Sequence, residues 1–270
     1  MTSVRAVRVD AGPSLLDLLT LEPLERDLYR ATTVFDDPFP LYGGQVAAQA
    51  LQAAGDTVSE DRAPHSLHCY YLRGGDASQP TIFRVERDRD GRSYSARRVV
   101  AVQGGEAIFT MSASFHVSEP GADRQVDPAP EATDPGELPP FVLPRLFSME
   151  GRLPPQAAPA PWPTRFWARH RGELAQTPLL HAGVLTYLSD ISSGLSPLRA
   201  EAWGSRSGAS LDHAVWFHRR IRMDDWVLLD LVPHTVAAGR GWYTGTVHSR
   251  DGVLGASLTQ ECLFRQERQA

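Results

Sequence analysis

Proline is clustered in the middle of this chain, and the cluster is the strongest constraint on how the chain can fold. Twelve of the 21 prolines lie between Pro120 and Pro163. Proline fixes φ and has no N–H, so this stretch is not expected to hold a helix or an interior strand. We predict a surface linker over residues 119–163, an N-terminal domain over residues 12–118 and a C-terminal domain over residues 164–267. The apolar middle of the linker, residues 140–153, is expected to pack against the protein.

The two halves of the chain share one pattern. Each begins with an apolar helix-like segment, residues 43–58 in the first half and residues 181–191 in the second. Long alternating runs follow, and the turns Gly104-Gly105 and Asp251-Gly252 each join two of these runs as in a β-hairpin. A helix that is apolar nearly all round needs a sheet wrapped around it, and a unit that occurs twice indicates an internal duplication. The pattern predicts an α+β protein with a double hotdog fold: two hotdog domains in tandem, each an antiparallel sheet wrapped on a central helix.

The composition excludes several classes of function. The formal net charge is −5 at pH 7, which gives no electrostatic basis for a nucleic-acid partner. All 27 basic residues are arginine, which excludes chemistry that depends on lysine, such as a Schiff base. No apolar run approaches the ~20 residues of a membrane span, and the first residues lack the apolar core of a signal peptide, so we expect a cytoplasmic protein. Cys69 and Cys262 form no ligand cluster, so neither a zinc site nor a disulfide framework is expected.

Six motifs point to a known family. The first half contains LYGGQVAAQAL (41–51), HSLHCYYLRGGD (65–76) and DGRSYSARRVVAVQGG (90–105). The second half contains TYLSD (186–190), ASLDHAVWFHR (209–219) and DGVLGASLTQE (251–261). In this order they resemble the type II acyl-CoA thioesterases, the TesB group. The resemblance implies a double hotdog fold, hydrolysis of fatty acyl-CoA to free fatty acid and CoA, no metal ion or organic cofactor, and a homo-oligomer.

The resemblance also implies the catalytic residues, which in this family are an Asp, a Thr and a Gln of the second half. They fall on Asp190 of TYLSD, Ser210 of ASLDH and Gln260 of SLTQE, and serine keeps the hydroxyl of the usual threonine. In this interpretation Asp190 takes a proton from a water that Ser210 and Gln260 hold in position, and no acyl-enzyme forms. Only the second half has all three side chains. A rough alignment of the halves places other residues at the matching positions of the first half: Leu51, Ser66 and Ala113.

The residues themselves permit this chemistry but leave alternatives open. Asp190 ends an apolar helical segment, where burial and the negative end of the helix dipole would raise its pKa toward that of a general base. The alternative is a solvated carboxylate at a helix end. On a strand, Ser210 and Asp212 share a face, which makes Asp212 the competitor for the role of base. A serine nucleophile is disfavoured, because neither Ser196 nor Ser210 lies in a G-x-S-x-G motif.

The first half is expected to supply a wall of the substrate site. Gly43, Gly44 and Gln45 open its helix and let a ligand approach the backbone, and His65 is a candidate substrate-binding residue with a structural role as the alternative. Backbone N–H groups at a helix N-terminus, from either half, are expected to bind the thioester oxyanion. The pocket depth is expected to depend on the linker and on Leu188, Trp216 and Phe217. Candidates for contact with the CoA phosphates are Arg73, Arg97 and Arg98.

Two other functions stay open at this point. One is a hydratase that acts on enoyl-CoA with the same fold, although the Asp and His pair of those enzymes is not found after Asp190. The other is a non-catalytic acyl-CoA-binding protein, against which the three polar side chains argue. An assay of CoA release with a panel of acyl-CoAs distinguishes the three functions.

Overall fold

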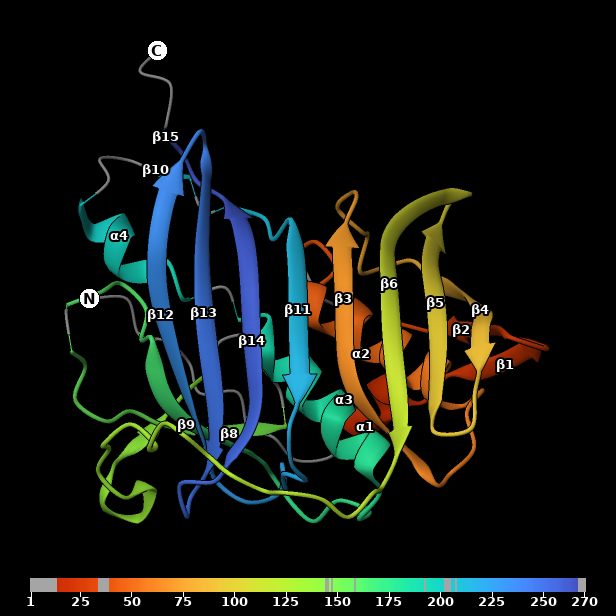
Figure 1. The fold of residues 1–270 in the computed structure, drawn as a ribbon. Helices are drawn as coiled ribbons and strands as arrows, with labels where there is room; N and C mark the ends of the chain where they lie inside the picture. Colours follow the sequence, from red (N-terminus) through yellow and green to blue (C-terminus); the bar gives the residue numbers. More distant parts are fainter. Residues whose placement is uncertain are drawn as a thin grey trace.

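One antiparallel sheet of 13 strands dominates the described part of the protein (Figure 1). The computed structural model describes residues 14–33, 39–143, 146, 148–157, 159–191, 193–201, 205–206 and 208–266. The strands of the sheet are β1 (Glu22–Glu25), β2 (Leu28–Ala31), β3 (Arg62–Tyr71), β4 (Thr81–Asp90), β5 (Tyr94–Gln103), β6 (Glu106–Val117), β7 (Pro140–Phe141), β8 (Met149–Arg152), β9 (Arg165–His170), β11 (Asp212–Phe217), β12 (Val227–Ala237), β13 (Arg240–Ser249) and β14 (Leu254–Leu263). Their spatial order is β1-β2-β4-β5-β6-β3-β11-β14-β13-β12-β9-β8-β7, so the halves of the chain form the halves of the sheet.

In the first half, the sheet packs on helix α2 (Gly43–Gly55). This helix is rich in alanine, which has the highest helix propensity and is small enough for close packing on several sides. Of the residues from Val46 to Ala54, all but Gln52 are buried. A short helix, α1 (Leu15–Leu19), packs beside it, and the Gln49 side-chain amide donates to the Leu18 carbonyl at 2.8 Å.

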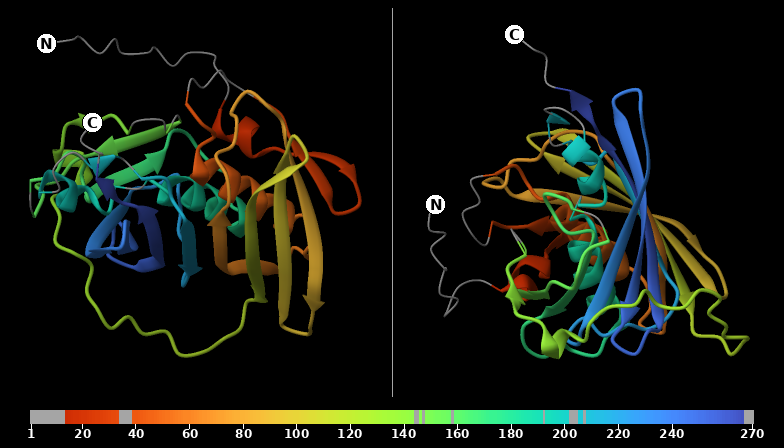
Figure 2. Two further views of the ribbon diagram at one scale, coloured as in Figure 1. Left: turned by 90° about the horizontal axis from the view of Figure 1, so that it is seen from above. Right: turned by 90° about the vertical axis from the view of Figure 1, so that its left-hand side faces the viewer.

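In the second half, the central helix is α3 (Pro178–Ser189), and every residue from His181 to Ser189 is buried. Proline suits the first position of a helix because that N–H has no partner within the helix. Both central helices lie on one side of the sheet (Figure 2). The ends of the two helices agree with the predicted spans to within three residues. The remaining elements are the 3₁₀ turn η1 (Pro135–Glu137), α4 (Ser196–Glu201) and a small sheet of β10 (Ser205–Arg206) with β15 (Arg265–Gln266).

The two halves meet along β3 and β11 and along their central helices. β3 pairs antiparallel with β11, with Cys69 opposite His213. The helices also run antiparallel. Just before α2, the Tyr42 hydroxyl donates to the Tyr187 carbonyl near the end of α3 at 2.8 Å, and near the end of α2 the Gln52 amide donates to the Leu179 carbonyl at 3.3 Å. Each helix therefore begins where the other ends.

The proline-rich segment agrees with the predicted linker only in part. Residues 118–134, all of which are described, contain no helix or strand and cross from one half to the other (Figure 2). The prediction that the stretch holds no interior strand is wrong, because β8 lies between β7 and β9. Residues 145–153 contain no proline, so every residue of β8 keeps its backbone N–H for the sheet. The apolar middle packs into the core, as expected, through Leu143, Leu146 and Met149.

Candidate active site

The end of α3 meets the start of α2 at Asp190. This residue is the C-cap of α3 and is 3% exposed. Gly43 and Gly44 leave space for it: a Cβ on Gly43 would overlap Asp190 Oδ2 and lie 2.8 Å from the Tyr71 ring, and a Cβ on Gly44 would overlap the Tyr187 carbonyl oxygen. The close approach of the two helices therefore requires glycine at both positions.

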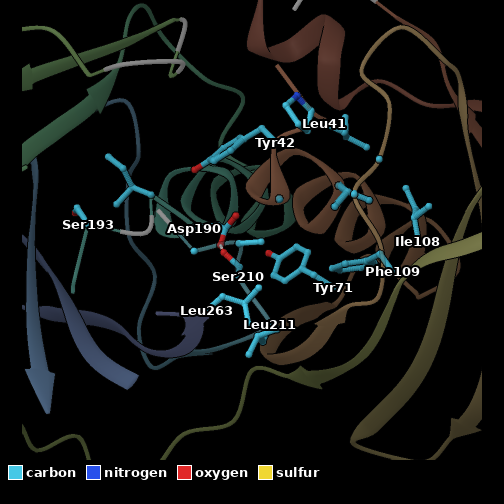
Figure 3. A pocket seen from close by; sticks show the side chains of 18 of the residues that line it. Leu41, Tyr42, Tyr71, Ile108, Phe109, Asp190, Ser193, Ser210, Leu211 and Leu263 are labelled. Carbon is cyan, nitrogen blue, oxygen red and sulfur yellow. Dashed lines mark hydrogen bonds between the residues drawn. The ribbon is translucent and has the colours of Figure 1, made fainter. Parts of the chain in front are cut away.

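Ser210 and Gln260 hold one oxygen of the Asp190 carboxylate. The Ser210 hydroxyl, which lies beside Asp190 in Figure 3, donates to Asp190 Oδ1 at 2.9 Å, and the Gln260 side-chain amide donates to the same oxygen. Gln260 lies fully buried in β14, and Tyr243, its partner on β13, donates its hydroxyl to Gln260 Oε1. An amide oxygen that accepts from Tyr243 leaves the amide NH₂ group to face Asp190. The structure thus brings together the three side chains that the resemblance implies.

Ser210 and Asp212 do not share a strand face, which corrects the prediction from alternation. β11 begins only at Asp212, and Ser210 pairs with Cys262 in an isolated bridge whose register differs by one residue from the β11–β14 pairing. A shift of one residue is a β-bulge and turns the side chain to the opposite face. Ser210 points at Asp190, whereas the Asp212 carboxylate accepts the Glu261 backbone N–H at 2.7 Å and does not line the pocket.

Asp190 and Ser210 open onto a pocket of about 730 Å³, a size typical of small-molecule sites. Both halves of the protein and the linker line it. Ile108 and Phe109 lie on one side of Asp190 and Ser193 lies on the other (Figure 3). Among the described lining residues, Asp190 is the only acid. The site is therefore a mostly apolar cavity with one carboxylate near its centre.

Burial raises the pKa of Asp190 from 3.8 to about 6. Hydrogen bonds from Gln260, Ser210 and the Gly44 N–H act in the opposite direction, because they stabilise the ionised form. The sequence predicts the effect of burial and, of the two helix dipoles, only that of the negative end of α3. The structure also places the positive start of α2 against this carboxylate, which opposes that effect. At neutral pH the carboxylate is mostly ionised and is basic enough to accept a proton.

The predicted substrate-binding residues occupy different places. Gly43 lines the pocket, whereas Gly44 and Gln45 follow in the first turn of α2 behind the lining. His65 lies away from the pocket, where its Nε2 is hydrogen-bonded to the Ser114 hydroxyl at 2.7 Å and its ring contacts Tyr94. A register shift in the pairing of β3 with β6 directly at this residue places His65 on the outer face of the sheet. This position corresponds to the structural alternative for His65.

Of the residues expected to set the pocket depth or to bind the CoA phosphates, only some line the pocket. Among the described lining residues are several of the linker, but not Leu188, Trp216 or Phe217. Arg73 lines the pocket. Arg97 is 1% exposed and donates to Thr57 and Asp90, so a phosphate cannot reach it. Arg98 lies outside the lining and pairs with Glu86 and Asp88.

Sequence reasoning missed two tyrosines at the site. The Tyr71 hydroxyl points toward Asp190 (Figure 3). Its alternation along β3 with the buried residues Leu67 and Cys69 is a signal that would have placed it on the inner face. Tyr243 has no such signal, because its contact with Gln260 depends on the register of β13 with β14.

The structure has further features that bear on the sequence predictions. No helix in the described ranges is long and apolar enough to cross a membrane. Within the same residues, no group of three or more His, Cys, Asp or Glu side chains is placed to hold a metal ion. Cys69 and Cys262 are both buried, and neither forms a disulfide with a described residue.

Comparisons with known proteins identify the family. The acyl-CoA thioesterase N-terminal domain family matches residues 36–116, and the acyl-CoA thioesterase C-terminal domain family matches residues 122–264. The chain belongs to the acyl-CoA thioesterase family. Acyl-coenzyme A thioesterase 8 of Homo sapiens is 34% identical over 283 residues, which cover 93% of this chain and 89% of that protein. Acyl-CoA thioesterase 2 of Haemophilus influenzae is 32% identical over 277 residues, which cover 93% of this chain and 97% of that protein.

Solved structures share the fold. The acyl-CoA thioesterase II TesB2 of Mycobacterium marinum is 38% identical, with a TM-score of 0.81 over 95% of this chain and 98% of that one. A hot dog protein of Alicyclobacillus acidocaldarius is 18% identical, with a TM-score of 0.77 over 93% of this chain and 98% of that one, and shows the fold alone. The predicted family and the predicted double hotdog fold are both confirmed.

Proposed function

We propose that this member of the acyl-CoA thioesterase family hydrolyses fatty acyl-CoA to a free fatty acid and CoA in the pocket beside Asp190. One observation carries the proposal: a buried carboxylate opens onto the pocket while Ser210 and Gln260 hold one of its oxygens. The relatives named as acyl-CoA thioesterases support the thioester substrate and a thioester hydrolase activity.

Asp190 acts as the general base in this proposal. Ser210 and Gln260 hold Oδ1, and Oδ2, which faces Gly43, takes a proton from a water in the pocket. The water oxygen attacks the thioester carbonyl carbon, the C–S bond then breaks, and the proton on Asp190 passes to the CoA thiolate. Ser210 borders the pocket and positions the water as well as the carboxylate, whereas Gln260 is fully buried and acts through Asp190. No acyl-enzyme is formed.

The first half supplies the donors for the oxyanion. α2 begins beside Asp190, and its N-cap residue, Tyr42, makes no side-chain hydrogen bond to the first turn. Backbone N–H groups at such a helix start attract negative charge. The Gly44 N–H contacts Asp190, and Gly43 lines the pocket without a side chain in the way. We assign the Gly43 N–H to the oxygen that becomes negative when water attacks.

An assay of thiol release with a panel of acyl-CoAs tests the function. We expect one CoA and one fatty acid for each thioester consumed, and no acylated protein by mass spectrometry during turnover. Consumption of enoyl-CoA without CoA release would favour the hydratase alternative, and binding without either reaction would favour the non-catalytic alternative. A trapped acyl group on Ser210 would contradict the water mechanism.

The sequence also leads us to propose an assembly and a cellular location for this protein. We expect a homo-oligomer, which size-exclusion chromatography with light scattering measures directly. We also expect a cytoplasmic enzyme, which cell fractionation tests.

A further inference from the structure

The two sides of the pocket differ in chemistry. The first-half side includes Leu41, Ile108 and Phe109 and the loop of Arg73, Gly74 and Gly75. The linker and the segment after α3 contribute a second group of lining residues, which we call the linker lobe: Phe141, Leu143, Leu146, Trp162, Pro163 and Ile191. Trp162 is hydrogen-bonded to Ser196, three residues after Ser193. Ser193 lies across Asp190 from Ile108 and Phe109 (Figure 3). Arg73 is the only basic residue among the described lining residues, and the linker lobe has no charged side chain. Arg73, which can bind a phosphate, therefore lies on one side of Asp190, and the uncharged linker lobe lies on the other.

We propose that the acyl chain occupies the linker lobe while the phosphate-bearing end of CoA leaves the pocket beside Arg73, so that the proline-rich linker sets the preferred chain length. The proposal rests on the hydrolysis proposed above. An alkyl chain gains about 25 cal/mol for each Å² of apolar surface that it buries, so an uncharged apolar lobe suits it. The phosphates of CoA need cationic partners and water, which a rim with an exposed arginine offers.

Close packing and hydrogen bonds hold the linker lobe in place. Phe141 pairs with Gly151 of β8, and a Cβ on Gly151 would lie 2.7 Å from the Phe141 carbonyl oxygen, so β7 and β8 approach closely. Leu143 and Leu146 are buried in the core. The Trp162 backbone N–H donates to the Ser196 hydroxyl at 2.7 Å, which attaches this part of the linker to the start of α4. These contacts hold the linker lobe in the position that the acyl chain meets.

Trp162 is the side chain of the linker lobe that can be changed with least effect on folding. It is 48% exposed and does not belong to the buried core. Its substitution by alanine lengthens the lobe toward solvent and leaves Leu143 and Leu146 in place.

Arg73 is held at the opposite rim. Its guanidinium donates to the Ala107 carbonyl at 2.7 Å and pairs with Glu106 at 2.9 Å. Both side chains of this pair are more than half exposed, and such pairs contribute little free energy. A phosphate can therefore replace Glu106 as the partner of Arg73. The adjoining loop is fixed by the Leu41 N–H, which donates to the Gly75 carbonyl at 2.9 Å.

The first arm of the test measures kcat/KM for saturated acyl-CoAs from short to long chains. Trp162→Ala should raise kcat/KM for the longest chains relative to the shortest by roughly tenfold, because a few methylene contacts in a hydrophobic pocket carry that discrimination. Trp216→Ala is the matched control, since Trp216 is also partly exposed but contacts His68 outside the pocket lining. The control should keep the wild-type profile.

The second arm compares acyl-CoA with the acyl-pantetheine thioester of the same fatty acid, which lacks the adenosine phosphates. Arg73→Gln should raise KM for acyl-CoA by roughly three- to tenfold and leave KM for acyl-pantetheine unchanged, because only the phosphate contact is lost. Arg98→Gln, which removes an exposed arginine outside the lining, should change neither value.

Clear results would overturn this orientation. If Trp162→Ala leaves the chain-length profile unchanged while Ile108→Ala shifts it, the acyl chain lies on the first-half side. Equal effects of Arg73→Gln on both thioesters would show that Arg73 does not meet the phosphates. A wild-type protein that releases no CoA from any chain length would instead contradict the proposed function itself.

Discussion

The two central helices end at the same residue type in different surroundings. α3 ends at its C-cap Asp190, and α2 ends at its C-cap Asp56. Asp190 is buried and accepts hydrogen bonds from Ser210 and Gln260, whereas Asp56 is exposed. The rough alignment that places Leu51 opposite Asp190 is therefore wrong, since Leu51 is a buried residue inside α2.

The start of the facing helix accounts for the difference. Asp190 lies against Gly43 and Gly44, which provide space and backbone N–H groups. The end of α2 lies against the start of α3, where Pro178 has no N–H and the Leu179 side chain fills the space that a Cβ on Gly55 would need. In this protein the acid at the end of α3 is thus buried where the partner helix opens with glycine, whereas the acid at the end of α2 is exposed.

The strands add to the difference between the halves. Ser66, which the alignment places opposite Ser210, lies on the face of β3 that also carries the exposed residues His68 and Tyr70. Ala113, opposite Gln260, is buried but has only a methyl group to offer. The hotdog fold therefore occurs twice, and the second half alone brings an Asp, a Ser and a Gln together among the described residues.

Removal of the proton acceptor should have the largest effect. Asp190→Asn keeps the shape of the side chain, so we expect kcat to fall by roughly 10²–10⁴ with little change in KM. Asp56→Asn, the same change at the other helix end, should leave both constants within about twofold of the wild type. Steady-state kinetics with one acyl-CoA measures both variants. Normal turnover by Asp190→Asn together with an inactive Asp212→Asn variant would show that Asp212 is the base.

Loss of the Ser210 hydroxyl should come next. Ser210→Ala removes the donor to Asp190 Oδ1 that also borders the pocket, so kcat should fall by roughly 10²-fold. Ser210→Thr keeps the hydroxyl and should retain most of the activity. The matching first-half variant, Ser66→Ala, should be neutral in the same assay. An equal loss in the threonine and alanine variants would mean that the size of the side chain matters rather than its hydroxyl.

The glycine at the start of α2 should matter more than the glycine at its end. A Cβ on Gly43 would overlap Asp190 Oδ2, so Gly43→Ala should lower kcat by roughly 10- to 100-fold through displacement of the carboxylate. Gly55→Ala meets only the flexible end of Leu179 and should affect thermal stability while kcat stays near the wild-type value. If both variants lose kcat equally, the close approach at Gly43 has no special role in catalysis.

Of the four predictions, acidification of the wild-type enzyme should cause the smallest loss of kcat. Burial raises the pKa of Asp190 to about 6, so kcat should be constant above this pH and fall as the carboxylate protonates below it. At pH 5 the loss should be about tenfold, one pKa unit below the midpoint. Asp56→Asn should keep this acid limb, and Asp190→Asn should lose it. A midpoint near pH 4 would indicate that the carboxylate is solvated during turnover.

Alternation along strands predicted the inner and outer faces well except where a strand is irregular. Ser210 and His65 both lie at register shifts of one residue, and each side chain faces opposite to the simple alternating pattern. Such a shift depends on how the partner strand is paired, which local sequence does not record. The same limit applies to Tyr243, whose contact with Gln260 is set by the pairing of β13 with β14.

The amino-acid sequence alone was sufficient to predict the repeated helix-and-sheet unit from its periodicity. The order of the motifs predicted the family and, through it, the three polar residues of the second half. Periodicity and motif order can be read from the sequence because they are local properties of the chain. Tertiary structure decided the rest. It placed Gly43 of the first half against Asp190 of the second and brought Phe141 and Trp162 of the linker to the pocket. These contacts join residues that are far apart in the chain, and they exist only because antiparallel packing of α2 on α3 and the pairing of β3 with β11 bring the two halves together.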